Sequence, residues 1–167
     1  MIYSIYTFSK SFLMRRQITN TGKIPHKDYF ARSVLRTSSF RSASWKNENI
    51  LILGDVDPLF ELAKDLSSCG ASVSFKSLRS LKDLYSLPIE QYSMVIMTSG
   101  SRKQQFDVVD VGGILRRADT DLVLVWASKQ FKLSTVSNAT TNAFCDIQLA
   151  LPASSSHLES FLSSPST

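Results

Sequence analysis

The chain has 167 residues, of which 43% are hydrophobic and 20% charged, and this composition excludes a wholly disordered protein. No apolar run approaches the roughly 20 residues that a transmembrane helix needs, so we expect no membrane span. Cys69 and Cys145 are too few for a disulfide scaffold or a zinc site, and they favour a reducing, cytoplasmic location.

The net charge of +5 is divided unevenly along the chain. Residues 1–46 carry nine basic groups and one acid, Asp28, whereas residues 47–167 carry ten basic and 13 acidic groups. We therefore predict a basic, Ser- and Arg-rich, disordered extension over 1–46, followed by one domain over 47–167. Two other interpretations of the extension stay open, namely a transit peptide to an organelle and a basic arm that binds nucleic acid.

The domain is predicted to alternate strands with helices. Short apolar runs predict strands at 50–53, 71–75, 94–97, 122–126 and 147–151. Helices are predicted from Asp57-Pro58 to Gly70, through 78–85, over 106–117, over 134–143, and from a capping box that opens at Ser156. Asp57 is the expected N-cap of the first helix.

This alternation predicts an α/β fold with a doubly wound, five-stranded parallel sheet of the flavodoxin-like kind and five flanking helices. In such folds ligands bind at the carboxyl ends of the strands. The positions of interest are therefore 54–57, 98–100, 127–128 and 151–152.

At these strand ends the chain resembles a response-regulator receiver domain. Residues 51–59 are similar to that family's first strand, acidic turn and Pro-Leu, and residues 110–117 look like its third helix. Leu151-Pro152 stands where the family has Lys-Pro. The resemblance covers residues 49–162 and implies a receiver-like fold and a signalling context, a two-component system or phosphorelay.

The resemblance also implies which parts of a phosphorylation site are missing. Asp55 matches the first acid of the turn and is a weak candidate for a metal ligand, while Val56 replaces the second acid. Thr98 occupies the place of the phosphate-accepting aspartate, and Leu151 that of the lysine. Ala127-Ser128 approximates the small hydroxyl residue that responds to phosphorylation. We therefore expect a pseudo-receiver with no catalytic residue and no cofactor.

Such a module would act through a protein partner, and a homodimer stays open. The resemblance implies a partner-binding face over roughly 134–162, whose candidate residues are Lys132, Asp146, His157, Glu159 and Phe161. A small-ligand- or nucleotide-binding doubly wound domain is the alternative, although the turn at 54–58 lacks the Gly-x-Gly-x-x-Gly pattern. Nucleic acid is not expected as a partner unless it binds through 1–46.

Overall fold

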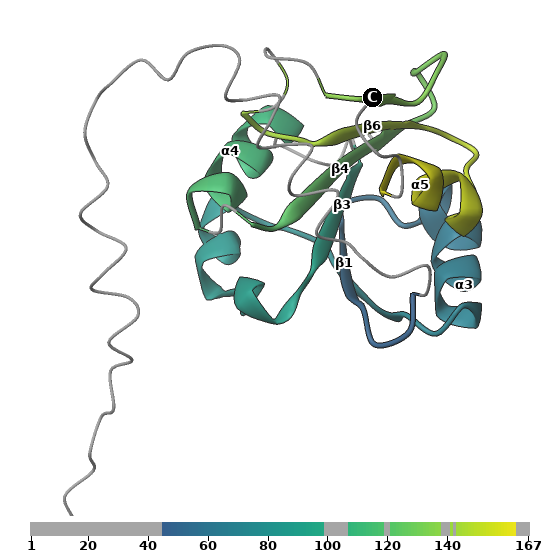
Figure 1. Cartoon of the computed structure of the whole chain (residues 1–167). Coiled ribbons are helices and arrows are strands. Elements are labelled where there is room, and N and C mark those ends of the chain that lie inside the picture. The colour runs from purple at the N-terminus through teal and green to yellow at the C-terminus, as the bar shows by residue number, and fades with distance from the viewer. Residues whose placement is uncertain (1–44, 99–106, 119–120, 138–140, 142, 163–167) are drawn as a thin grey trace, which may run out of the picture.

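The computed structural model describes residues 45–98, 107–118, 121–137, 141 and 143–162, and the predictions for 1–44, 99–106, 119–120, 138–140, 142 and 163–167 lie outside this part. These residues form an α/β fold around one six-stranded sheet (Figure 1). Its strands are β1 (Asn49–Leu53), β2 (Ser72–Lys76), β3 (Met94–Thr98), β4 (Val123–Ser128), β5 (Thr135–Val136) and β6 (Ile147–Ala150).

The order of strands across the sheet is β2-β1-β3-β4-β6-β5. The first five strands in this order are parallel, and β5 pairs antiparallel with β6 at the edge. The sheet is therefore mixed, with six strands, and the prediction of five parallel strands is corrected by the added edge strand.

Helical segments cover both faces of the sheet. They are η2 (Asp57–Leu59), α3 (Phe60–Ser68), η3 (Leu81–Ser86), η4 (Ile89–Gln91), α4 (Val108–Ala118) and α5 (Ser155–Leu162), where η denotes a 3-10 helix. α3 and α5 pack on one face, with Leu66 and Leu158 in the same core as Ile50 and Ile52. α4 and η3 pack on the other, with Leu115 and Leu84 against Leu51 and Leu53. Figure 1 shows α4 and the α3–α5 pair on opposite sides.

β1 illustrates why the central strands are continuous apolar runs. Ile50 and Ile52 belong to the α3–α5 core, whereas Leu51 and Leu53 belong to the α4–η3 core. Successive side chains of a strand point to opposite faces, so a strand covered on both faces needs apolar residues at every position. The predictions for this strand and for β3 are confirmed.

The connection between β4 and β6 contains no helix among its described residues. Thr135 and Val136 form β5 and pair with Gln148 and Ile147, respectively. The helix predicted over 134–143 is therefore wrong for its described residues, while 138–140 and 142 lie outside the described part. Thr and Asn favour a helix weakly, and Thr135 and Val136 pair with a neighbouring strand instead.

The segment predicted as a helix over 78–85 contains the 3-10 helix η3, which begins only at Leu81. Leu78, Leu81, Leu84 and Leu87 recur every three residues, and all four contribute to the α4–η3 core. A period of three is that of a 3-10 helix, whose side chains at i and i+3 eclipse one another. Tyr85, which lies outside this apolar row, is 75% exposed.

The folded body begins before the predicted boundary at residue 47. Trp45 is only 5% exposed and belongs to the α3–α5 core. Gly70, which follows α3 with a positive φ of 101°, lies against the backbone of Lys46.

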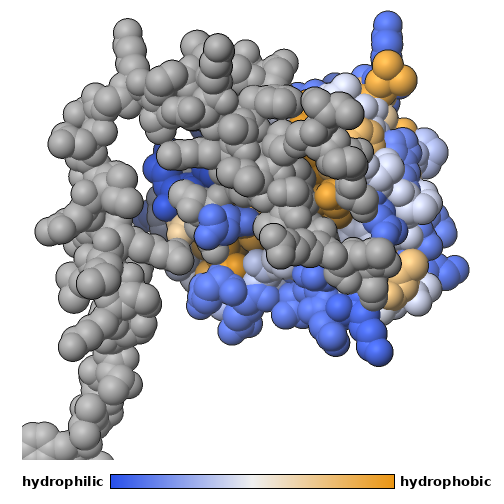
Figure 2. All heavy atoms as spheres, in the orientation of Figure 1, coloured by the Kyte–Doolittle hydropathy of each residue, from blue (hydrophilic) through white to orange (hydrophobic). Residues whose placement is uncertain are grey.

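The described surface in Figure 2 is mostly hydrophilic, with scattered hydrophobic patches. Within the described ranges, no helix is both long and apolar enough to cross a membrane.

Candidate functional site

The carboxyl ends of β1 and β3 are joined by a side chain that the sequence marked as a site position. The Oγ1 of Thr98, the last residue of β3, accepts the backbone N–H of Asp55 at 2.8 Å. The same hydroxyl lies 3.3 Å from the Asp55 carbonyl oxygen, to which it donates. Thr98 is 5% exposed, so both hydrogen bonds form at a site largely protected from water. The hydroxyl therefore connects the two strand ends.

The Asp55 carboxylate holds the turn that follows β1. Its Oδ1 accepts the backbone N–H of Asp57 at 3.4 Å. The 3-10 helix η2 begins at Asp57. Its N-cap residue is Val56, which makes no side-chain capping hydrogen bond. The prediction that Asp57 caps this helix is therefore wrong, and the side chain that contacts the first turn belongs to Asp55.

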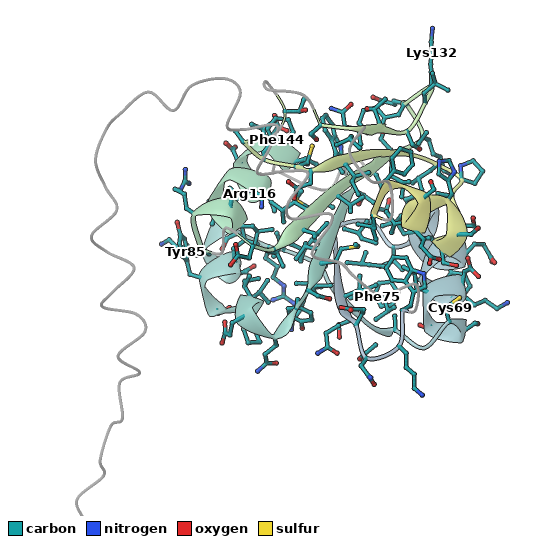
Figure 3. All side chains as sticks on the ribbon, viewed as in Figure 1. Cys69, Phe75, Tyr85, Arg116, Lys132 and Phe144 are labelled. Atoms are coloured by element: carbon teal, nitrogen blue, oxygen red, sulfur yellow. The ribbon has the colours of Figure 1, made fainter. Side chains whose placement is uncertain are left out.

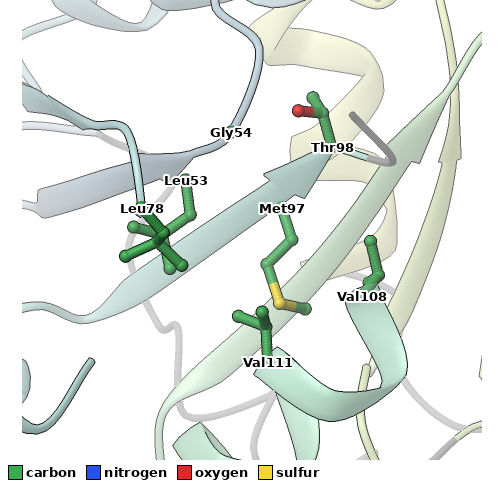
Figure 4. A pocket seen from close by; sticks show the side chains of 7 residues that line it. All are labelled: Leu53, Gly54, Leu78, Met97, Thr98, Val108 and Val111. Carbon is green, nitrogen blue, oxygen red and sulfur yellow. The ribbon is translucent and has the colours of Figure 1, made fainter. Parts of the chain in front are cut away.

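A small pocket lies beside this connection, on the α4 side of the sheet (Figure 4). Its cavity volume is about 20 Å³, which has room for about one water molecule. The lining residues are Leu53, Gly54, Leu78, Met97, Thr98, Val108 and Val111. Thr98 contributes the only side-chain hydroxyl of this lining, and that hydroxyl already has two backbone partners. A hard cation or a phosphoryl group needs several oxygen ligands or cationic donors, which this lining does not supply.

The remaining receiver-like positions also lie at the carboxyl ends of the parallel strands. Ala127 of β4 pairs in register with Thr98, and Ser128 is paired with Ala150 of β6. The Ser128 Oγ accepts the backbone N–H of Gln130 at 3.1 Å, and the Ser128 carbonyl accepts that of Leu151 at 3.1 Å. Ser128 thereby stabilises the turn after β4.

Leu151 takes part in the core where the resemblance implies a lysine. It is 9% exposed and belongs to the α3–α5 core. The peptide bond between Leu151 and Pro152 is cis. The structure thus brings the following residues to the carboxyl ends of the parallel strands, where they make backbone hydrogen bonds or apolar contacts: Asp55, Thr98, Ala127, Ser128 and Leu151.

The described residues contain no group of three or more His, Cys, Asp or Glu side chains that could hold a metal ion. Asp55, Asp107 and Asp110 each adjoin a pocket-lining residue in the sequence, namely Gly54, Val108 and Val111.

The partner-face candidates divide into surface and buried residues. Lys132 is exposed and extends away from the body (Figure 3). His157 is exposed and stacks on the half-buried Phe161, with ring centroids 5.5 Å apart, and Glu159 is half-buried on the same helix. Asp146 is 0% exposed and therefore does not lie on the surface that partner binding requires.

Asp146 instead forms a buried ion pair that the sequence analysis missed. Its Oδ2 lies 2.6 Å from an Arg116 nitrogen and accepts the backbone N–H of Leu124 at 2.9 Å. Arg116 also donates to the Leu122 carbonyl at 2.8 Å. The pair fastens α4 to the starts of β4 and β6. The partners lie 30 residues apart, and the only local signal is an acid directly before an apolar strand.

α5 begins two residues earlier than the predicted capping box implies. It starts at Ser155, and the Oγ of Ser154 accepts the backbone N–H of His157 at 3.2 Å. The capping hydroxyl is therefore Ser154 and not Ser156. The backbone N–H of Ser155 donates to the Asp65 carboxylate of α3 at 2.6 Å, and this bond lowers the pKa of Asp65 below its ordinary value.

Aromatic side chains from the β4–β6 connection, which was predicted to contain a helix, contact β4. The ring of Trp126 contacts those of Phe131 and Phe144 edge-on, with centroid distances of 4.8 and 5.8 Å. Phe131 and Phe144 belong to the connection between β4 and β6, on either side of β5. The partner face that the resemblance implies is thus built from β5, β6 and α5, without a helix among the described residues of that connection.

Comparison with known proteins adds no family assignment. No protein-family model matches the chain, and no curated protein matches it.

Proposed function

We propose that this protein is a receiver-like signalling module that has lost phosphorylation and acts by binding another protein. The observation that carries the proposal is the pair of hydrogen bonds between Thr98 and the backbone of Asp55. A receiver needs a free carboxylate at the end of this strand as its nucleophile. Here a hydroxyl stands at that position, and it connects two strand ends.

The parallel part of the sheet supports the receiver-like interpretation. The order β2-β1-β3-β4-β6, with β1 and β3 adjacent at its centre, places the end of β3 beside the acidic turn after β1. The helices on both faces fit a doubly wound arrangement of these five strands. β5 would then be an addition to that arrangement at its edge.

The neighbouring positions support the loss of the whole site. Phosphoryl transfer requires a cation that balances the charge of the phosphoryl oxygens. Leu151, at the lysine position, is part of the apolar core, and the side chains that line the adjoining pocket are apolar except for that of Thr98. Restoring one residue would therefore not restore the chemistry.

Incubation of the full chain with acetyl phosphate and Mg²⁺, followed by intact mass measurement, tests the loss of phosphorylation. We expect no phosphoryl adduct. A stoichiometric adduct on the wild-type chain would contradict the proposal.

A restored variant tests the receiver-like interpretation itself. The triple variant Val56→Asp, Thr98→Asp, Leu151→Lys returns the second acid, the nucleophile and the lysine, and it should gain an adduct. The matched control replaces Thr98→Asp by Thr98→Asn, which has the same shape but no nucleophilic carboxylate. Because a lysine at the buried Leu151 position can destabilise the fold, the double variant Val56→Asp, Thr98→Asp is measured beside it. If the triple variant folds and takes up no phosphoryl group, the receiver-like assignment fails, and an adduct on the double variant alone would also support it.

The partner should bind the face made by β5, β6 and α5. His157→Ala and Lys132→Ala change exposed residues of this face, whereas Lys64→Ala changes an exposed residue of α3. Affinity capture with the full chain should therefore lose the same protein with the first two variants and retain it with the third. Equal capture by all three would place the partner on another surface.

A further inference from the structure

The sheet ends in two unequal edges, and the β2 edge is the one that another strand can extend. β5, at one end, has only two residues. β2, at the other end, has five residues, and among the described residues it pairs with a strand, β1, on one side only. A five-residue edge exposes a row of backbone N–H and C=O groups that can pair with another chain.

The hydrogen bonds to β1 determine which backbone groups of β2 point outward. The Ser72 N–H donates to the Glu48 carbonyl at 2.8 Å, and the Lys76 carbonyl accepts the Gly54 N–H at 3.2 Å. In a parallel ladder alternate residues of a strand face the same neighbour, so Ser72, Ser74 and Lys76 face β1. Val73 and Phe75 therefore direct their N–H and C=O groups away from the sheet.

The side chains of the outward-facing residues are apolar. Val73 and Phe75 pair in register with Ile50 and Ile52, so all four project to the α3–α5 side. Phe75 remains 43% exposed there, although it is a large aromatic residue at a strand position (Figure 3). A strand laid along β2 would cover this ring and pair with the outward backbone groups, which no described strand uses.

The geometry points to a second copy of this chain as that strand, and we propose that two copies associate through antiparallel pairing of their β2 strands. A two-fold axis through Ser74 places Val73 of each copy opposite Phe75 of the other. Since these are the two outward-facing residues, each such pair can exchange two backbone hydrogen bonds. Lys76 falls opposite Ser72, so the register opposes no like charges, and each Phe75 ring meets a valine.

This dimer does not depend on the proposed signalling function. Two five-residue strands bury far less than the roughly 1,600 Å² of a standard interface, so the association is expected to be weak and reversible. It would join two sheets into one continuous sheet.

Cysteine cross-linking of the full chain tests the register of the dimer. In an antiparallel ladder the residues of a non-hydrogen-bonded pair have Cα atoms about 4.5 Å apart, which lies within the range that a disulfide spans. Because Ser74 would oppose itself in such a pair, Ser74→Cys should form a covalent dimer under mild oxidation. Ser72→Cys is the matched control, since its counterpart in the second copy is Lys76. Both are made with Cys69→Ser, because Cys69 is exposed.

Sedimentation equilibrium of the full chain over a range of concentrations tests the association itself. The average mass should rise towards that of a dimer, and Phe75→Pro should keep it at that of a monomer. Proline removes the outward N–H of this position and leaves the ladder to β1 intact. If Phe75→Pro does not fold by circular dichroism, the cross-linking series decides. A wild-type chain that stays monomeric throughout, or equal cross-linking of Ser72→Cys and Ser74→Cys, would overturn the proposal.

Discussion

Gly112 of α4 lies directly against the backbone of Phe144, the residue that precedes the buried Cys145 and Asp146. A Cβ atom on Gly112 would come within 2.1 Å of the Phe144 carbonyl oxygen, whereas one on the neighbouring Gly113 would meet nothing within 4 Å. The two adjacent glycines therefore have different roles, and the first allows the segment before β6 to pack on α4.

Alanine at each position should separate these roles. Gly112→Ala forces the Phe144 segment to move, and we expect it to lower the free energy of unfolding by about 1–3 kcal/mol, as overpacking does. Gly113→Ala should raise it by about 0.5–1 kcal/mol, because alanine favours a helix more than glycine does. Urea unfolding of both variants measures the difference, and equal effects would contradict the close contact.

Arg116 and Arg117 offer a similar comparison at the end of α4. Arg116 forms the buried pair with Asp146, whereas Arg117 is exposed. Arg116→Ala would leave the Asp146 carboxylate buried without its cation, which should cost about 3–5 kcal/mol of stability. Arg117→Ala should change stability by less than about 0.5 kcal/mol. Chemical unfolding of the two variants checks this, and a small loss for Arg116→Ala would mean that the pair contributes little.

The contact between Asp65 and Ser155 should make stability depend on pH at acid values. The hydrogen bond from the Ser155 N–H lowers the pKa of Asp65 in the folded protein. A carboxylate with a lowered pKa stabilises the fold above its unfolded pKa of about 3.9, and this contribution is lost as the pH falls through the folded value. Asp65→Asn should therefore be less stable than the wild type at pH 7, and the difference should shrink below about pH 4.

Glu61→Gln is the control for this pH dependence, since Glu61 lies on the same helix and is exposed. Thermal unfolding from pH 3 to 7 is the measurement. A difference between Asp65→Asn and the wild type that stays constant over this range would assign the effect to packing and not to the carboxylate charge.

The basic extension gives a separate prediction about nucleic acid. Residues 1–44 carry eight of the nine basic groups of the predicted extension. If this arm binds duplex DNA, the logarithm of the affinity should fall linearly with the logarithm of salt, with a slope of about −0.9 per phosphate neutralised. Deletion of 1–44, which leaves the buried Trp45 in place, should abolish the binding, as fluorescence anisotropy would measure. Binding that survives the deletion would place the nucleic-acid surface on the body.

The central strands could be predicted because their signal is local. Four successive apolar residues at 50–53 identify a strand that is buried on both faces, and 94–97 repeat the pattern. The edge strand β5 could not be predicted this way. Its two residues become a strand only because Gln148 and Ile147 are available as partners, and that pairing is a tertiary contact.

The candidate site shows the same limit. The sequence indicated that Thr98 and Asp55 stand at neighbouring strand ends, but not that the hydroxyl bonds to the backbone of the turn. Asp57 has the sequence features of a helix cap, since it precedes a proline, yet the carboxylate that contacts the turn is two residues earlier. Asp146 was predicted to lie on the partner-binding surface, because its ion-pair partner, Arg116, is 30 residues away in the sequence.

The two cysteines differ in a way that provides a selective chemical probe. Burial raises the pKa of the Cys145 thiol to about 11, so this thiol stays protonated and unreactive at neutral pH, whereas Cys69, which follows α3, is exposed. A maleimide dye should therefore label one position on the native chain and two after denaturation. Because Cys69 contacts Ser155 of α5, that single dye would report on whether α3 and α5 stay together when a partner binds.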